Sequence, residues 1–131
     1  MDSNQISFSF PDVYQGLGCG GGIARATSAG LTIEYQVKDG FFGVIKSGVR
    51  RVEIPFSELQ SVTLKQGWFR NRLFIKVRNL ATLADVPGSD LCRVELRVAR
   101  ADKRAAQALV SVLTLSLSER ELAAMDRRAL T

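Results

Sequence analysis

Two adjacent large aromatic residues, Trp68 and Phe69, stand among cations at a position where the flanking alternation predicts a turn. Turns usually carry small or polar residues, so large aromatic side chains there either fill the core or contact a partner. A mixture of aromatic and cationic residues is typical of surfaces that bind proteins or nucleic acids. The candidate binding residues are Lys65, Trp68, Phe69, Arg70, Arg72 and Phe74.

The chain has no histidine, which removes the most common general base and the most common metal ligand. A Ser-His-Asp or Cys-His arrangement is therefore excluded. We expect the carboxylates on outward strand positions or in a turn to be solvated; they are Glu34, Glu53, Glu58 and Glu95. Cys19 and Cys92 show neither a C-x-x-C pairing nor a ligand spacing, and no cation near Cys19 in sequence activates its thiol. We therefore expect no enzyme, no metal site and no cofactor.

The net charge favours anionic partners only modestly. Lys and Arg number 18 against 13 Asp and Glu, a net charge of +5, and no run of four basic residues occurs. We interpret this excess as a solvated basic surface. The outward cations of the last two predicted strands are Lys76, Arg78, Arg93 and Arg97. Because Glu95 interrupts this row, nucleic acid is not an expected partner.

Hydrophobic and polar residues alternate along most of the chain, which is the period-two pattern of half-buried strands. The six predicted strands cover residues 23–28, 31–38, 51–56, 61–65, 73–78 and 92–98. The segment Ser28–Gly30 is a turn short enough for a hairpin, whereas residues 39–48 form either a further hairpin or an apolar loop. Six evenly spaced strands separated by turn residues favour an all-β barrel or sandwich.

The first 22 residues contain one alternating fragment, Ile6–Phe10, followed by a glycine-rich string from Gly16 to Gly22. Each glycine loses much backbone entropy on ordering, so we predict a flexible connector and expect residues 1–22 to be dispensable for folding. A phosphate-binding loop would need a helix directly after the glycines, and a strand pattern follows instead.

A helical period begins after the last strand. Asp102 is a suitable N-cap, and the apolar residues that share one helical stripe are Ala106, Leu109, Val110, Leu113 and Leu117. We predict that this stripe is buried against the open end of the barrel. A second helix-start signal, Ser118–Glu121, means that the tail either extends this helix or frays.

Three stretches resemble bacterial pleckstrin-homology-like domains: Ala29–Tyr35, Glu53–Val62 with its I-P-F-x-x-L-x-x-V pattern, and the helix from Asp102 to Leu117. The resemblance covers residues 23–117. It implies a mainly β fold, a pleckstrin-homology-like bent antiparallel barrel of six to seven strands capped by one C-terminal α-helix, with Phe41–Lys46 or Ile6–Phe10 as the seventh strand. Residues 1–22 and 118–131 lie outside the resemblance. From their own composition we expect a flexible Gly-rich N-terminal segment over 1–22 and a C-terminal helical extension or tail over 118–131.

The resemblance implies little about the ligand, because this fold hosts lipid, peptide and protein binders. Phosphoinositide-binding members carry a basic motif on the first two strands, whereas Lys65, Arg70 and Arg72 have its spacing on the fourth and fifth predicted strands. We therefore expect a non-catalytic module that binds a protein or peptide, a second copy of the chain included, through the aromatic-basic turn or an open strand edge. Anionic phospholipid head groups are the alternative.

The start of the chain has no basic leader, and no apolar run reaches the roughly 18 residues needed to span a bilayer. We therefore expect the protein in the cytoplasm.

Overall fold

The computed structural model describes residues 5–10, 18–39, 49–68, 70–83, 86 and 92–129, without the side chains of residues 18, 19, 37–39, 70 and 80. Phe69, the side chain of Arg70 and the segment Phe41–Lys46 therefore lie outside the described residues.

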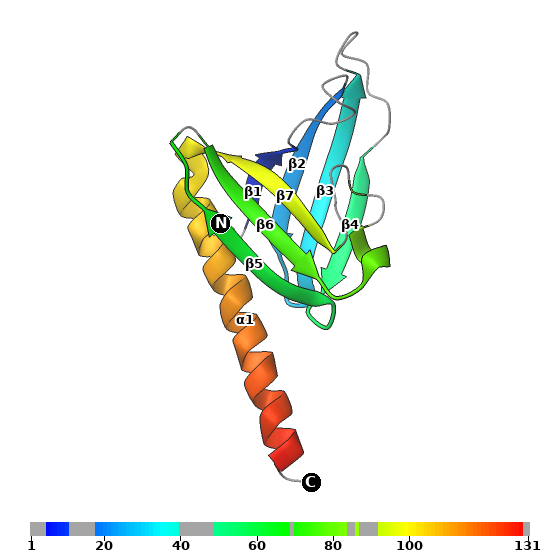
Figure 1. Cartoon of the computed structure of the whole chain (residues 1–131), viewed down its shortest axis with the longest axis vertical. Helices are drawn as coiled ribbons and strands as arrows, with labels where there is room; N and C mark the ends of the chain where they lie inside the picture. The colour runs from blue at the N-terminus through cyan, green and yellow to red at the C-terminus, as the bar shows by residue number, and fades with distance from the viewer. Residues whose placement is uncertain are drawn as a thin grey trace.

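The described strands form one antiparallel sheet that curls into a half-barrel (Figure 1). The strands are β1 (Gln5–Ser9), β2 (Gly18–Ala26), β3 (Gly30–Asp39), β4 (Arg50–Pro55), β5 (Leu59–Lys65), β6 (Arg70–Val77) and β7 (Arg93–Ala99). Their order across the sheet is β4-β3-β2-β1-β7-β6-β5. The predicted fold class, a mainly β, bent antiparallel barrel with one C-terminal helix, is confirmed.

The first strand joins the two halves of the sheet. β1 pairs with β2 along its whole length, from Gln5 opposite Arg25 to Ser9 opposite Gly21, and with β7 where Ser9 lies opposite Arg97. The seventh strand is therefore the fragment that begins the chain. The prediction of a flexible connector over residues 1–22 is wrong for its described parts, 5–10 and 18–22, because both lie in or next to the sheet.

The glycines of β2 permit a close approach of neighbouring strands. A Cβ atom on Gly21 would lie 2.5 Å from the carbonyl oxygen of Phe8 on β1, and one on Gly22 would overlap the carbonyl oxygen of Glu34 on β3. Because β2 lies between these two strands, side chains at both positions would push the sheet apart. The glycines are therefore a packing requirement of a central strand.

The core fills the concave side of the curled sheet. Every strand contributes alternate residues to it, among them Ile6, Ala24, Ile33, Ile54, Val62, Ile75 and Leu96. Three aromatic rings meet edge to face where β1 ends: the centroids of Phe8 and Phe10 are 5.2 Å apart, and those of Phe10 and Tyr35 are 5.5 Å apart. This geometry is the preferred one for aromatic pairs, so β1 is fixed by side chains as well as by backbone pairing.

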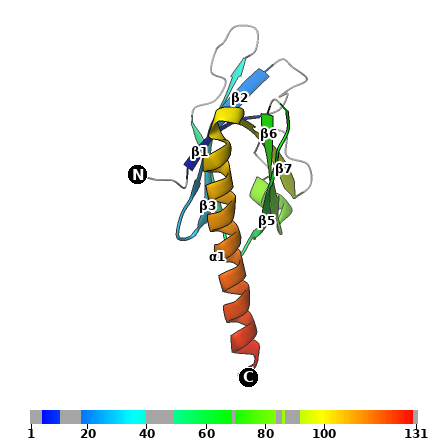
Figure 2. The same cartoon turned by 90° about the vertical axis from the view of Figure 1, so that its left-hand side faces the viewer.

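A short 3-10 turn, η2 (Arg100–Asp102), leads into the single long helix, α1 (Lys103–Ala129). Ala106, Leu109 and Leu113 are fully buried, and Val110 and Leu117 pack against the core, so the predicted stripe is confirmed. Figure 2 shows α1 over the opening between the two halves of the sheet, with its second half extending beyond the strands. The helix continues without a break through the second start signal at Ser118, so the tail extends the helix.

None of the helices in the described part of the chain has a stretch long and apolar enough to cross a membrane.

The sheet has two open ends. Among the described residues β4 pairs only with β3, and β5 pairs only with β6. One row of backbone N–H and C=O groups on each of these edge strands therefore has no strand partner among the described residues.

Candidate partner-binding surface

Trp68 lies at the tip of the β5–β6 hairpin. The two strands pair from Leu59 opposite Val77 to Lys65 opposite Arg72, so the turn between them is short. Trp68 is 88% exposed as a residue, which excludes the alternative that it belongs to the core. Lys65 and Arg72 are exposed at the base of this tip.

The outer faces of β5, β6 and β7 bring nine side chains into three cross-strand rows. The rows are Lys65–Arg72–Arg97, Thr63–Phe74–Glu95 and Ser61–Lys76–Arg93. We call these nine residues the basic face, because five of them are cations and one is a carboxylate. Charges that are spread thinly along the sequence are thus gathered on one side of three strands.

The single carboxylate of the basic face, Glu95, lies near two of its cations. Its two oxygens lie 3.9 Å from a guanidinium nitrogen of Arg72 and 4.0 Å from Nε of Arg97. The expectation that Glu95 interrupts the row of cations is confirmed. Lys65, Lys76 and Arg93 form no ion pair with any other described residue, so the face keeps an excess of positive charge.

Like charges lie directly opposite one another on this face. Lys65 is opposite Arg72, and Arg72 is opposite Arg97. Lys76 is likewise opposite Arg93. Directly opposed like charges destabilise an antiparallel sheet, and Glu95 offsets this only for Arg72 and Arg97. Lys76 opposite Arg93 has no such compensation among the described residues.

Phe74 is half-buried in the middle of the basic face. The guanidinium carbon of Arg93 lies 4.6 Å from the centre of its ring, a cation–π distance. A shallow hollow of about 360 Å³ surrounds this pair and is lined by Ser61, Thr63, Lys65, Phe74, Lys76 and Arg93. The hollow therefore offers hydroxyl donors and positive charge over an aromatic floor.

A second hollow lies on the other side of β5, between its open edge and the helix. It measures about 610 Å³ and is lined by Val62, Thr63, Leu64, Gln66, Gln107, Val110 and Ser111. We call it the β5–α1 groove. Its floor is aliphatic and its rim is polar, and residues of β5 line one of its sides. Backbone groups, apolar surface and cations are thus found together on one strand.

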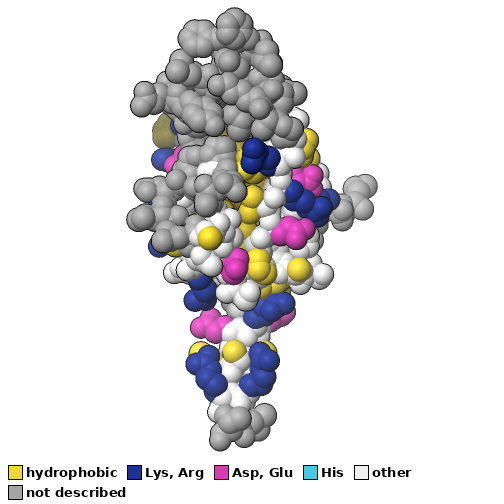
Figure 3. Space-filling view, turned by 90° about the vertical axis from the view of Figure 1, so that its right-hand side faces the viewer, with side chains coloured by type: hydrophobic (Ala, Val, Ile, Leu, Met, Phe, Trp, Pro, Cys, Tyr) yellow, Lys and Arg dark blue, Asp and Glu magenta, His cyan; other side chains and the backbone are white. Residues whose placement is uncertain are grey.

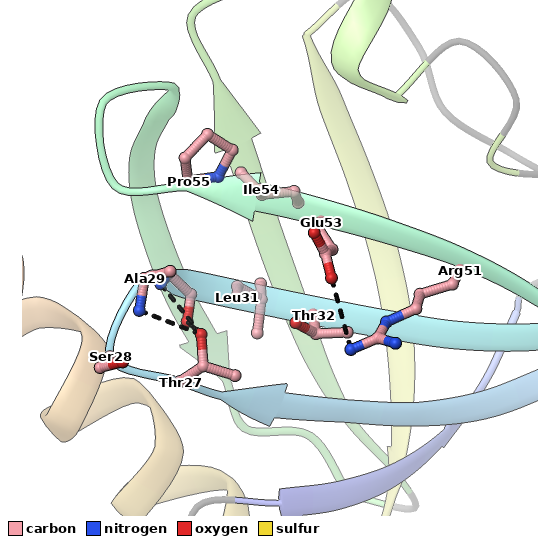
Figure 4. Close-up of a pocket in the computed structure, with 10 residues that line it drawn as sticks. Thr27, Ser28, Ala29, Leu31, Thr32, Arg51, Glu53, Ile54 and Pro55 are labelled. Atoms are coloured by element: carbon pink, nitrogen blue, oxygen red, sulfur yellow. Dashed lines mark hydrogen bonds and ion pairs between the residues drawn. The ribbon is translucent and has the colours of Figure 1, made fainter.

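The opposite edge of the sheet differs in its charges. A hollow of about 410 Å³ lies between the β2–β3 turn and β4 (Figure 4), where Arg51 and Glu53 form an ion pair at 3.3 Å. The hydroxyl oxygen of Thr27 accepts hydrogen bonds from the backbone N–H groups of Ala29, at 3.2 Å, and Gly30, at 3.1 Å. These polar groups form hydrogen bonds or ion pairs with one another, so the hollow presents no excess charge to a ligand.

Gly30 is required at the start of β3. Its φ of +154° is rarely adopted by other residues, and a Cβ atom there would overlap the carbonyl oxygen of Ile54. The predicted hairpin turn at Ser28–Gly30 is confirmed. Figure 3 faces the side of the molecule on which β4 lies, where cationic, acidic and hydrophobic side chains are interspersed in the coloured region.

The predicted binding residues are therefore placed as follows. Lys65, Arg72 and Phe74 belong to the basic face, and Trp68 stands exposed at its rim; Arg70 begins β6, and Phe69 lies outside the described residues. Lys76, Arg93 and Arg97 were predicted as outward cations but not as binding residues, and the register of β6 and β7 places them on the same face as Arg72 and Phe74.

Comparisons of the chain with protein-family models, with curated proteins and with solved structures found no match. The functional assignment therefore depends on the geometry of this surface.

Proposed function

We propose that this chain is a non-catalytic interaction module that binds a protein or peptide partner along the open edge of β5. The observation that carries the proposal is the 88% exposure of Trp68 at the end of that edge. Tryptophan is enriched among the residues that dominate binding energy, and an unpaired strand edge accepts an added strand from a partner. Trp68 and the β5 edge together supply an anchor and a template.

The β5 edge is a better template than the β4 edge. β4 ends at Pro55, which has no backbone N–H to donate to an added strand. Two of the three charged side chains of β4, Arg51 and Glu53, also pair with each other. β5 has neither feature, and it lies beside the β5–α1 groove, so it offers backbone groups and apolar surface to the same partner.

The element order supports the resemblance to bacterial pleckstrin-homology-like domains. Seven antiparallel strands followed by one helix agree with the arrangement that the resemblance implies. The fold hosts several classes of binder, so it supports an interaction module without choosing the ligand. A second copy of the chain is one candidate partner, and the cytoplasm is the compartment that we propose.

Anionic phospholipid is the second candidate ligand. The excess of cations on the basic face, with the indole of Trp68 at its rim, supports it, because cations are attracted to anionic head groups and tryptophan sits well at a membrane interface. A lipid surface would leave the open edge of β5 and the β5–α1 groove unused, so we rank it below a peptide partner.

The test compares capture of partners by wild type and by Trp68→Ala. The protein is immobilised, exposed to lysate of its natural host and washed, and its own oligomeric mass is measured by light scattering. We expect Trp68→Ala to reduce capture or self-association roughly tenfold, because truncation of an anchoring tryptophan typically costs more than 1 kcal/mol of binding.

The matched control is Leu115→Ala, which truncates another exposed hydrophobic residue, 60% exposed on α1. It should capture the same partners as wild type. Equal capture by wild type and Trp68→Ala, with both proteins folded, would reject the proposed function.

A further inference from the structure

We infer that the partner of β5 is an extended segment in which acidic and apolar residues alternate, added to the sheet as an eighth strand. The inference rests on the proposed function, and it adds the chemistry of the partner. It follows from the two faces of β5, because one face is basic and the other is aliphatic.

Successive side chains of a strand point to opposite faces of the sheet. In β5 the outward residues Ser61, Thr63 and Lys65 belong to the basic face. The inward residues Val62 and Leu64 line the β5–α1 groove. A strand that pairs with β5 lies about 4.8 Å away and repeats this alternation. Every second side chain of the partner therefore joins the basic face, and the others enter the groove.

The outward side chains of the partner meet positive charge. Lys65 lies on the strand directly beside them, and Arg72 and Lys76 lie one strand further, within about 10 Å, which is close to the screening length at physiological salt. The carboxylate of the basic face, Glu95, is on the third strand from the edge and lies close to Arg72 and Arg97. Acidic residues are therefore favoured at these positions of the partner.

The inward side chains of the partner meet aliphatic surface. Val62 and Leu64 on β5 and Val110 on α1 provide the floor of the groove, and the polar rim consists of uncharged residues, Gln66 and Gln107 with Thr63 and Ser111. A groove of about 610 Å³ with this lining accepts aliphatic side chains of moderate size and gives no ion pair to a charged one. Apolar residues are therefore favoured at these positions.

The opposed like charges of the basic face support the same partner. Lys65 opposite Arg72 and Lys76 opposite Arg93 destabilise the free sheet, and carboxylates on an added strand relieve this repulsion. A nucleic acid or a membrane would also relieve it, but neither has side chains that fill the apolar groove while the backbone pairs with β5. The combination favours a peptide strand.

The test uses fluorescein-labelled peptides whose central seven residues match the length of β5. One peptide alternates glutamate and valine, a second alternates lysine and valine, and a third has the glutamates in one block and the valines in another. We expect the alternating acidic peptide to bind at least about tenfold more tightly than the other two by fluorescence anisotropy, with an affinity that falls as salt rises.

Two variants separate the two sides of the strand. Lys65→Glu combined with Lys76→Glu should lower the affinity for the alternating acidic peptide roughly tenfold at low salt. Val110→Ala should lower this affinity roughly threefold at every salt concentration. Arg51→Glu on β4 and Thr114→Ala on the exposed side of α1 are the matched controls, and both should bind like wild type.

Equal binding of the alternating and blocked acidic peptides would overturn the inference. Tighter binding of anionic vesicles or of a single-stranded oligonucleotide than of any peptide would also overturn it. In that case Lys65→Glu with Lys76→Glu would weaken the binding of those ligands, and Val110→Ala would leave it unchanged. These results leave the proposed function intact as long as partner capture still requires Trp68. Capture that does not require Trp68 rejects the proposed function instead.

Discussion

The guanidinium carbon of Arg120 lies 4.7 Å from the centre of the Phe56 ring. Phe56 is buried in the turn between β4 and β5, whereas Arg120 projects from α1 two turns beyond Leu113, the last fully buried residue of the helix. The contact therefore connects the part of the helix outside the core to the turn that precedes the binding strand. This tertiary contact helps to explain why α1 continues as a helix past the second start signal at Ser118.

Replacing Arg120 with alanine should lower the free energy of unfolding by about 0.5 to 1 kcal/mol, the range of exposed cation–π pairs. The measurement is denaturation in urea, and Arg104→Ala, which removes an exposed arginine from the same helix, is the control. Equal effects of the two changes would show that the ring contact contributes nothing.

Two leucines of α1, separated by one residue, provide a matched pair. Leu113 is fully buried against the sheet and Leu115 is 60% exposed. Leu113→Ala should cost about 2 to 5 kcal/mol because it removes methyl groups from a packed core, whereas Leu115→Ala should cost less than about 0.5 kcal/mol. Chemical denaturation of both variants checks this. A cost below about 0.5 kcal/mol for Leu113→Ala would mean that the helix does not close the half-barrel.

The alternation of hydrophobic residues was sufficient to predict the strands from Leu31 onward, because each has one face in the core. It failed for the first half of β2, where Gly20, Gly21 and Gly22 have no side chains to alternate. The reason for these glycines is the closeness of β1 and β3, and a single sequence does not show which strands become neighbours. Glycine abundance was therefore mistaken for flexibility.

The candidate site was predicted in part for a similar reason. The tip at Trp68 was visible as aromatics in a turn, but its exposure depends on β5 ending at Lys65 and β6 beginning at Arg70. The rest of the basic face comes from cross-strand register between segments about 20 residues apart. Sequence spacing gives the face of each residue along its own strand, and it does not give the neighbours on the next strand.

The place of β1 in the sheet reverses the expectation that residues 1–22 are dispensable. Phe8 is buried and contacts Phe10 edge to face, so Phe8→Ala should cost about 3 to 5 kcal/mol of stability. Ser7→Ala on the exposed face of the same strand is the control and should stay within about 0.5 kcal/mol of wild type. Thermal and urea denaturation measure both. If Phe8→Ala is as stable as wild type, the expectation that residues 1–22 are dispensable for folding would stand.

A buried polar group offers a stabilising substitution. Asn71 is 3% exposed on the inner side of β6, and its Nδ2 has no hydrogen-bond partner among the described residues. An unsatisfied buried donor costs about 1 to 3 kcal/mol, so Asn71→Leu, which keeps a similar volume, should raise the free energy of unfolding by about 1 kcal/mol. Asn71→Asp should lower it, because a carboxylate there is worse than an amide. A loss of stability in Asn71→Leu would contradict this account.

The basic face should make the stability of the free protein depend on salt. Lys76 lies directly opposite Arg93, and the Thr63–Phe74–Glu95 row separates it from Lys65 and Arg72, so its charge meets repulsion mainly from Arg93. Salt screens exposed charges within about 10 Å at 0.1 M, so the free energy of unfolding of wild type should rise as salt increases from about 10 to about 200 mM.

Reversing the charge of Lys76 converts one opposed like-charge pair into an opposite-charge pair. Lys76→Glu should therefore stabilise the protein by about 0.5 kcal/mol at low salt and reduce the rise with salt, whereas Arg51→Glu on β4, which breaks the ion pair with Glu53, should not stabilise it. Urea denaturation at the two salt concentrations measures both effects. A wild-type stability that falls with added salt would show that the cations of this face are already balanced within the protein, and it would remove the physical reason for an acidic partner.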